Sequence, residues 1–207
     1  MDVARPYAAF GPTLDGAVLN VLAGTTRPLT GREVSRLAGR RSHAGVLDTL
    51  ARLVEHGLVN RQEAGRALLY TLNRDHLAAP AVLMLAGLRE ELFRRLREAI
   101  APWDIPPVHA SLFGSAARGD GGTSCDIDLL VIRPPGIAED DAQWRQQLDV
   151  LAASVLSWTG NRLSVSDVSE DDIPRLREAD APILRELDED SILLAGAALP
   201  AVTRSAG

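Results

Sequence analysis

Apolar residues between Leu14 and Gly57 recur at the spacing of amphipathic helices. The pattern predicts three short helices, which end at Gly24, Gly39 and Gly57. Thr30 is the predicted N-cap of the second helix, because Glu33 stands three residues later, at the spacing of a capping box. Ser42 is the predicted N-cap of the third helix, which is longer than the second.

A β-hairpin is predicted after these helices, because residues 58–63 and 66–72 flank the tight-turn sequence Ala64-Gly65. Helices followed by a hairpin form the outline of a winged helix-turn-helix. Residues 14–73 resemble the winged-helix domains of bacterial transcription regulators, mainly through the sequence L-x-x-L-x-x-x-G-L-V at residues 50–59.

This resemblance implies a partner, double-stranded DNA. In a winged helix the third helix enters the major groove by its N-terminal end, and the wing touches the DNA backbone. The residues expected to contact DNA are Arg40, Arg41, Ser42 and His43 at the helix end and Arg61 and Arg66 in the hairpin. Arginine pairs with phosphates or with guanine edges. Winged helices also serve as protein-interaction or dimerisation modules, and that alternative stays open.

Residues 79–101 predict one long linking helix with a broad apolar stripe and a polar side of mixed arginines and glutamates. The helix ends before Pro102, and Pro106-Pro107 marks the entry to a second domain. A stripe of this width is typical of a domain brace or of a seam between two copies, so we expect a homodimer.

A strand, a glycine turn and a pair of carboxylates follow in the second domain. The apolar run 110–113 predicts a buried strand that ends at Gly114 and Ser115. Ten residues later, Asp126 and Asp128 form an Asp-x-Asp sequence at the start of a second apolar strand. Alternation along a strand places the two carboxylates side by side on one face.

Two neighbouring carboxylates repel each other unless a cation lies between them. Oxygen ligands of this kind suit Mg²⁺, or Mn²⁺, which completes its coordination with substrate phosphates. Gly114 allows a close approach of the backbone, and Ser115 offers an amide and a hydroxyl donor to a phosphate. A hairpin with a solvated acidic end is the alternative.

Residues 112–132 resemble the GS-x10-DxD signature of the minimal nucleotidyltransferases, which belong to the polymerase-beta-type nucleotidyltransferase superfamily. The resemblance implies that Asp126 and Asp128 are catalytic metal ligands and that Gly114 and Ser115 contact the phosphates of an NTP. Arg118 either reaches the same phosphates or is an ordinary surface residue.

The family has a third carboxylate on a later strand, and Asp167 is the residue expected in that place. It alternates with Leu163 and Val165 on one face of a predicted strand. We expect Asp167 to be a metal ligand or the base for the incoming hydroxyl. Its rivals are typical of the first turn of a helix, and they are Glu170, Asp171 and Asp172.

The charge distribution indicates two domains with different partners. The chain has 207 residues and a net charge of −6. Residues 1–76 carry ten arginines against seven acids (+3), and residues 77–207 carry twelve against twenty-one (−9), which together give the net charge of −6. The chain has a single cysteine, Cys125, which excludes a disulfide framework. No leader or membrane-spanning run is visible in the sequence, so we expect a cytoplasmic protein without a membrane partner.

We therefore expect an α+β protein. Its parts are a winged helix-turn-helix over residues 1–78, the linking helix over 79–101, a mixed α/β nucleotidyltransferase-like domain over 102–198 and a disordered tail over 199–207. The expected activity is Mg²⁺-dependent transfer of a nucleoside monophosphate from an NTP to an unidentified acceptor hydroxyl on a protein, a tRNA or a small molecule. The alternative is a transcription regulator whose nucleotidyltransferase domain senses nucleotide or mediates assembly without turnover. A third alternative is an antitoxin that combines the two, modifying a partner toxin and repressing its own promoter.

Overall fold

A computed structural model shows a mixed α+β protein with two compact units, Arg5–Arg89 and Met1–Ala4 together with Glu90–Gly207. The residues that the structure describes are 1–3, 5, 7–8, 14–39, 42–119, 125–173, 175 and 191–198. The predicted DNA contacts Arg40 and Arg41 and the predicted tail over 199–207 lie outside the described residues. Within these residues, no helix is long and apolar enough to cross a membrane.

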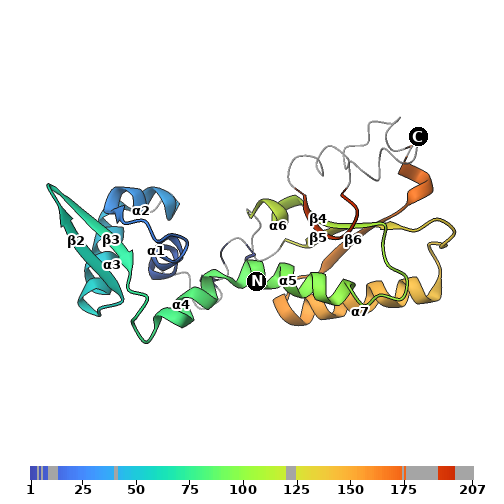
Figure 1. Cartoon of the computed structure of the whole chain (residues 1–207), viewed down its shortest axis with the longest axis horizontal. Coiled ribbons are helices and arrows are strands. Elements are labelled where there is room, and N and C mark those ends of the chain that lie inside the picture. The colour runs from blue at the N-terminus through green and yellow to red at the C-terminus, as the bar shows by residue number, and fades with distance from the viewer. Residues whose placement is uncertain are drawn as a thin grey trace. The chain divides into compact units, whose positions relative to one another are not determined.

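The Arg5–Arg89 unit consists of helices and one small antiparallel sheet (Figure 1). Its elements are α1 (Leu14–Ala23), β1 (Leu29–Thr30), α2 (Gly31–Leu37), α3 (His43–Glu55), β2 (Val59–Ala64), β3 (Ala67–Leu72) and α4 (Ala79–Ala86). The sheet has the strand order β1-β3-β2. Val18, Val34 and Leu50 are fully buried between the three helices and the sheet.

The predicted helix caps and hairpin are present in this unit. The side chain of Thr30 accepts a hydrogen bond from the Glu33 amide, and the Glu33 carboxylate accepts one from the Thr30 amide at 2.8 Å. The Ser42 hydroxyl caps α3. β2 and β3 pair from Val59 to Leu72 around Gly65, whose φ of +61° is the left-handed conformation that a tight turn requires.

The single helix expected over 79–101 is instead two helices, α4 and α5 (Leu88–Ile100), which meet at Gly87. Gly87 weakens the helix at this point because glycine has more backbone freedom to lose than other residues. Val82, Leu83 and Ala86 of α4 pack on the core of the Arg5–Arg89 unit. Leu92 and Leu96 of α5 are instead buried in the core of the second unit. The stripe of α5 is therefore not available as a seam between two copies.

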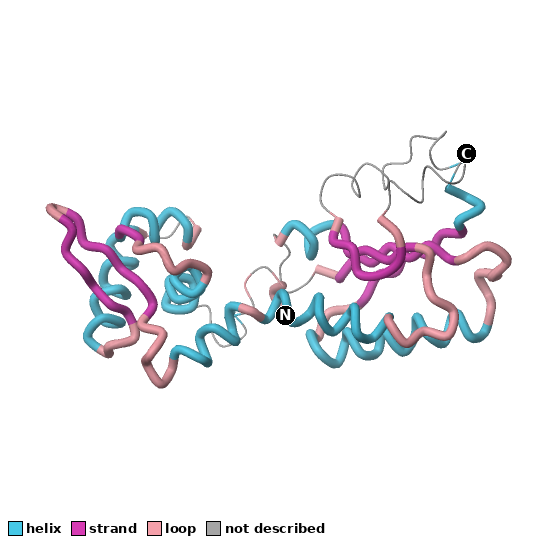
Figure 2. Tube along the Cα trace, in the orientation of Figure 1, coloured by secondary structure: helices cyan, strands magenta, loops and turns pink. Residues whose placement is uncertain are grey.

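The second unit is built on a four-stranded mixed sheet with the strand order β6-β5-β4-β7. In addition to α5, its elements are β4 (His109–Phe113), α6 (Gly114–Arg118), β5 (Ile127–Arg133), α7 (Ala142–Thr159), β6 (Leu163–Ser169), a 3-10 turn (Glu170–Asp172) and β7 (Ile192–Gly196). β4 is antiparallel to β5 and to β7, while β5 and β6 are parallel and are connected through α7. Figure 2 shows the strands as a central magenta layer.

Helices α5 and α7 cover one face of this sheet, as Figure 1 shows. The odd-numbered residues of β5, such as Leu129 and Val131, are buried against these helices together with Trp144. The even-numbered residues Leu130 and Ile132 lie on the opposite face, in a separate apolar cluster. Successive side chains of β5 thus point alternately to the face that the helices cover and to a second face, on which Asp128 lies.

Candidate functional site

The glycine turn and the carboxylate pair meet where β4 ends and β5 begins. The antiparallel register places Phe113 opposite Asp128, so Gly114 lies beside the Asp128 side chain. Gly114 has a φ of +65°, and a Cβ atom at this position would lie 2.7 Å from Asp128 Oδ2. Only glycine meets both demands, because it tolerates the left-handed conformation and has no Cβ.

Asp128 is the second residue of β5, and Asp126 lies just before the strand begins at Ile127, so their placement side by side on one face stays a prediction. Asp126 directly precedes β5 and is exposed, and Asp128 is half-buried. Ser115 and Arg118 lie on the short helix α6, which begins directly after β4. Ser115 is half-buried, whereas Arg118 is exposed at the end of α6. The structure therefore brings together Gly114 and Asp128, and places the other predicted residues next to them along the chain.

The structure does not bring Asp167 to this site. Asp167 is in register with Val131, on the helix-covered face of the sheet. Its Oδ2 accepts hydrogen bonds from Arg133 Nη1 at 2.8 Å and from the Trp144 indole N–H at 3.0 Å. The expectation that Asp167 completes a three-carboxylate centre does not fit this placement. The register of β6 on β5 sets Asp167 on the face of the sheet opposite to Asp128.

The residue in register with Asp128 on β6 is Ser164, and it is exposed. Residues in register on neighbouring strands point to the same face of a sheet, so Ser164 lies on the face of Asp128. The sequence carried a signal for this: Asp167 shares its face with Leu163 and Val165, and apolar side chains mark the face that a helix covers.

The other three acids considered for the third position lie beyond the end of β6. Glu170, Asp171 and Asp172 form a 3-10 turn that Ser169 caps by accepting the Asp171 amide. This turn follows Ser169, which is in register with Arg133 at the far end of β5 from Asp128. The turn is therefore separated from Asp128 by the length of β5.

The donors at the candidate site fit a hard divalent cation. The ligand types that Mg²⁺ and Mn²⁺ accept include the carboxylate oxygens of Asp126 and Asp128 and the hydroxyl of Ser164, which lies on the face of Asp128. Among the described residues, no cluster of three or more histidine, cysteine, aspartate or glutamate side chains could hold a metal ion. A cation at this site would therefore need further oxygen ligands from water or from a bound phosphate.

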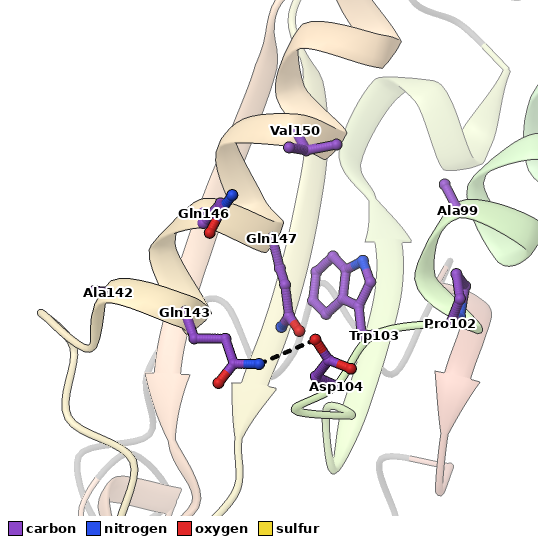
Figure 3. A pocket seen from close by; sticks show the side chains of 9 residues that line it. All are labelled: Ala99, Pro102, Trp103, Asp104, Ala142, Gln143, Gln146, Gln147 and Val150. Atoms are coloured by element: carbon purple, nitrogen blue, oxygen red, sulfur yellow. Dashed lines mark hydrogen bonds between the residues drawn. The ribbon is translucent and has the colours of Figure 1, made fainter.

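A cavity of about 620 Å³ opens between the end of α5 and the first half of α7, on the helix-covered side of the sheet (Figure 3). It is lined by Ala99, Pro102, Trp103, Asp104, Ala142, Gln143, Gln146, Gln147 and Val150. Gln143 donates a hydrogen bond to Asp104 at 3.0 Å, and Trp103 packs edge-on against Trp144. None of the predicted site residues lines this cavity, so it is separate from the carboxylate pair.

The Arg5–Arg89 unit has a basic cavity of about 510 Å³ between α2, α3 and the hairpin. It is lined by Thr30, Gly31, Arg32, His43, Leu47, Arg66, Ala67, Leu68 and Tyr70. The structure thus places the predicted DNA contacts His43 and Arg66 in one hollow. Arg32 also lines this cavity, although no sequence motif predicted a role for it. Of the other predicted DNA contacts, Ser42 caps α3 and Arg61 is exposed on β2.

No family model and no curated protein matches the chain. A crystal structure of a toxin-antitoxin with AMP-PNP is similar at 21% identity and a TM-score of 0.34, over 57% of this chain and 80% of that chain. A candidate nucleotidyltransferase from Sulfolobus solfataricus is similar at 17% identity and a TM-score of 0.26, over 51% of this chain and 77% of that chain.

Proposed function

We propose that the second unit is a divalent-metal-dependent nucleotidyltransferase that moves a nucleoside monophosphate from an NTP to an acceptor hydroxyl, with release of pyrophosphate. The observation that carries this proposal is the contact between Gly114 and Asp128. Through it, the turn that would hold phosphates lies directly against a carboxylate that would hold the metal. The GS-x10-DxD sequence, which resembles that of the minimal nucleotidyltransferases, supplies both parts.

The residues of the site have separate roles in this proposal. Asp126 and Asp128 hold Mg²⁺ or Mn²⁺ through carboxylate oxygens, and the bound metal supplies neutralisation of phosphate charge. Gly114 lets the NTP phosphates approach the backbone, and the Ser115 hydroxyl donates a hydrogen bond to a phosphate oxygen. Arg118, at the end of α6, adds a positive charge for the same phosphates.

A regulator that binds metal and NTP without turnover is the second candidate, and Ser164 is the observation that favours it. A serine hydroxyl carries no negative charge and is a poor proton acceptor near neutral pH. Among the described residues, the acceptor hydroxyl would then lose its proton to water or to a carboxylate that already holds the metal. Turnover by this chain is therefore expected to be slower than in a site with three carboxylates.

We propose that the Arg5–Arg89 unit binds double-stranded DNA. Its element order, with three helices before a two-stranded hairpin, is typical of a winged helix. The cavity between α2, α3 and the hairpin contributes Arg32, His43 and Arg66 to one surface, and none of the described residues that line it is acidic. Basic side chains gathered on a concave surface suit a phosphate backbone.

Label transfer from radioactive NTPs tests the catalytic proposal. Wild-type protein incubated with each labelled NTP, Mg²⁺ or Mn²⁺ and a cell lysate should transfer label to an acceptor, and the Asp126→Ala/Asp128→Ala variant should not. Asp140→Ala, which replaces an exposed acid just before α7, is the control that should keep the activity. Metal-dependent NTP binding without transfer would support the second candidate, and neither binding nor transfer would exclude both.

Salt-dependent DNA binding tests the role of the Arg5–Arg89 unit. The logarithm of the association constant for a mixed-sequence duplex falls with the logarithm of salt concentration by about 0.9 per phosphate contact. Arg66→Ala and Arg32→Ala should each reduce that slope by about one contact. Arg27→Ala should leave it unchanged, because Arg27 pairs with Glu33 outside the cavity. Equal slopes for all three variants would contradict the proposal.

A further inference from the structure

Strand β6 has a neighbour on one side only, within the part of the chain that the structure describes. Its pairing with β5 is regular from Leu163 to Ser169. The Ile127 amide donates to the Arg162 carbonyl, so the polar backbone groups of the even-numbered residues face β5. Those of Leu163, Val165 and Asp167 therefore point away from the sheet, toward the free edge.

This edge lacks the features that normally prevent strands of different molecules from pairing. β6 contains no proline, no lysine and no bulge, and five of its seven residues are serine or valine. Its single charged side chain is Asp167, which is held by Arg133 and Trp144 and does not lie free at the edge. A regular strand of this kind is a template for a further strand.

A cavity of about 290 Å³ runs beside the edge, between β6 and α7. It is lined by Leu163, Val165 and Asp167 of β6, by Arg145, Leu148, Asp149 and Ala152 of α7, and by Glu139. Arg145 and Asp149 are both exposed and form no ion pair with each other or with other described residues. The cavity thus presents both signs of charge next to unpaired backbone donors and acceptors.

We propose that the free edge of β6 pairs with β6 of a second copy of this chain, in antiparallel orientation about a two-fold axis near Val165. The two sheets then form one continuous sheet, with both α7 helices on the same face. A two-fold axis sets the same surface patch of each copy against the other. Arg145 of each copy then faces the acidic side of the other copy's cavity, where Asp149 lies.

Charge complementarity favours a second copy over another extended partner, because one cavity carries both the cation and the anion that a symmetric contact requires. The apolar stripe of α5 cannot serve instead, since Leu92 and Leu96 are buried within their own unit. This inference does not depend on nucleotidyl transfer. It predicts a dimer in the absence of metal, NTP and DNA.

Charge reversal tests the contact with the full chain in sedimentation velocity experiments. Arg145→Glu and Asp149→Arg should each weaken self-association at least tenfold, and an equimolar mixture of the two variants should form the dimer again. Gln146→Glu is the matched control on the same helix, because Gln146 lines the cavity between α5 and α7 and not the one beside β6. This variant should leave the dimer unchanged. A monomer at all concentrations, or a dimer that neither reversal weakens, would overturn the proposal.

Hydrogen exchange locates the contact independently. The amides of Leu163, Val165 and Asp167 should exchange fast in dilute protein and become protected as the concentration rises through the dimerisation range. Protection at every concentration would show that another segment of the same chain covers the edge. Protection that appears only when an extended peptide of different sequence is added would show another partner. Either result would overturn pairing with a second copy.

Discussion

Asp128 on β5 is in register with Ser164 on β6, so a hydroxyl lies on the same sheet face where a carboxylate was expected. Asp167, the expected residue, lies on the opposite face in a bond with Arg133. Within the described part of the chain, the candidate site thus offers two carboxylates in place of three. This arrangement lowers the negative charge available to a divalent cation and removes the nearest candidate for a base.

Replacing Ser164 by aspartate should therefore increase metal affinity. Ser164→Asp adds a third carboxylate beside Asp128, and each added anionic ligand favours a divalent cation. We expect Mn²⁺ to bind about tenfold more tightly, measured by titration calorimetry in the absence of nucleotide.

Asp167→Asn is the control for this prediction. Because Asp167 lies on the helix-covered face, its neutralisation should leave Mn²⁺ affinity unchanged. A loss of Mn²⁺ binding in Asp167→Asn, with no gain in Ser164→Asp, would show that the metal is bound on the other face of the sheet.

Gly114→Ala should abolish metal and nucleotide binding while leaving most of the fold in place. The new Cβ would lie 2.7 Å from Asp128 Oδ2, so the carboxylate has to move. The left-handed backbone adds a strain of about 1–2 kcal/mol.

Gly136→Ala is the matched variant, because Gly136 has a φ of +80° and no atom within 4 Å of its added Cβ. It should show a similar loss of thermal stability and keep normal Mn²⁺ binding. Equal Mn²⁺ binding by both variants would contradict the role of the Gly114–Asp128 contact.

Asp167→Ala should destabilise the second unit by about 3 kcal/mol, because it leaves the buried guanidinium of Arg133 without its anion. The side chains of Arg133 and Asp167 are only 8% and 16% exposed. Trp144→Phe removes one neutral donor to Asp167 and should cost about 1 kcal/mol. Urea unfolding followed by circular dichroism measures both values, and a loss below 1 kcal/mol for Asp167→Ala would contradict a structural role.

His109 should make the stability of the second unit depend on pH. Burial lowers the pKa of His109 below its ordinary value, even though the ring bonds the Ala197 carbonyl. The folded state then favours the neutral ring, so its contribution is present above about pH 6.5 and is lost as the pH falls toward the lower folded pKa.

Urea unfolding between about pH 7.5 and pH 5.5 tests this, with a slope of at most about 1.4 kcal/mol per pH unit from one group. Hydrogen bonds lower the pKa of Glu33 and Glu91 to about 2, so both stay ionised in this window. His109→Gln should remove the slope that His109 contributes. An unchanged slope in that variant would assign the pH dependence to other groups.

Local signals in the sequence predicted the parts of this fold that depend on neighbouring residues. The Thr30–Glu33 capping box and the hairpin around Gly65 are confirmed, because each depends on residues a few positions apart. The two apolar strands on either side of the glycine turn were also predicted, and the structure pairs them as β4 and β5.

Long-range relationships were less accessible from the sequence. The pairing of Asp128 with Ser164 depends on how α7 returns the chain to the sheet, and a shift of one residue changes the face on which Asp167 lies. The break between α4 and α5 at Gly87 could not be predicted because the apolar stripe continues through it. The two helices nevertheless pack on two different cores.

Metal-dependent binding of a non-hydrolysable NTP analogue tests the central claim most directly, since it requires the carboxylates and the glycine turn together. Titration calorimetry with Mn²⁺ present should show binding by wild-type protein and by the control Asp140→Asn, and a loss of at least about 100-fold in Asp126→Asn/Asp128→Asn. Without Mn²⁺, wild-type binding should fall to the level of that double variant. Equal affinity of the double variant and wild type, or binding that does not need the metal, would contradict the account.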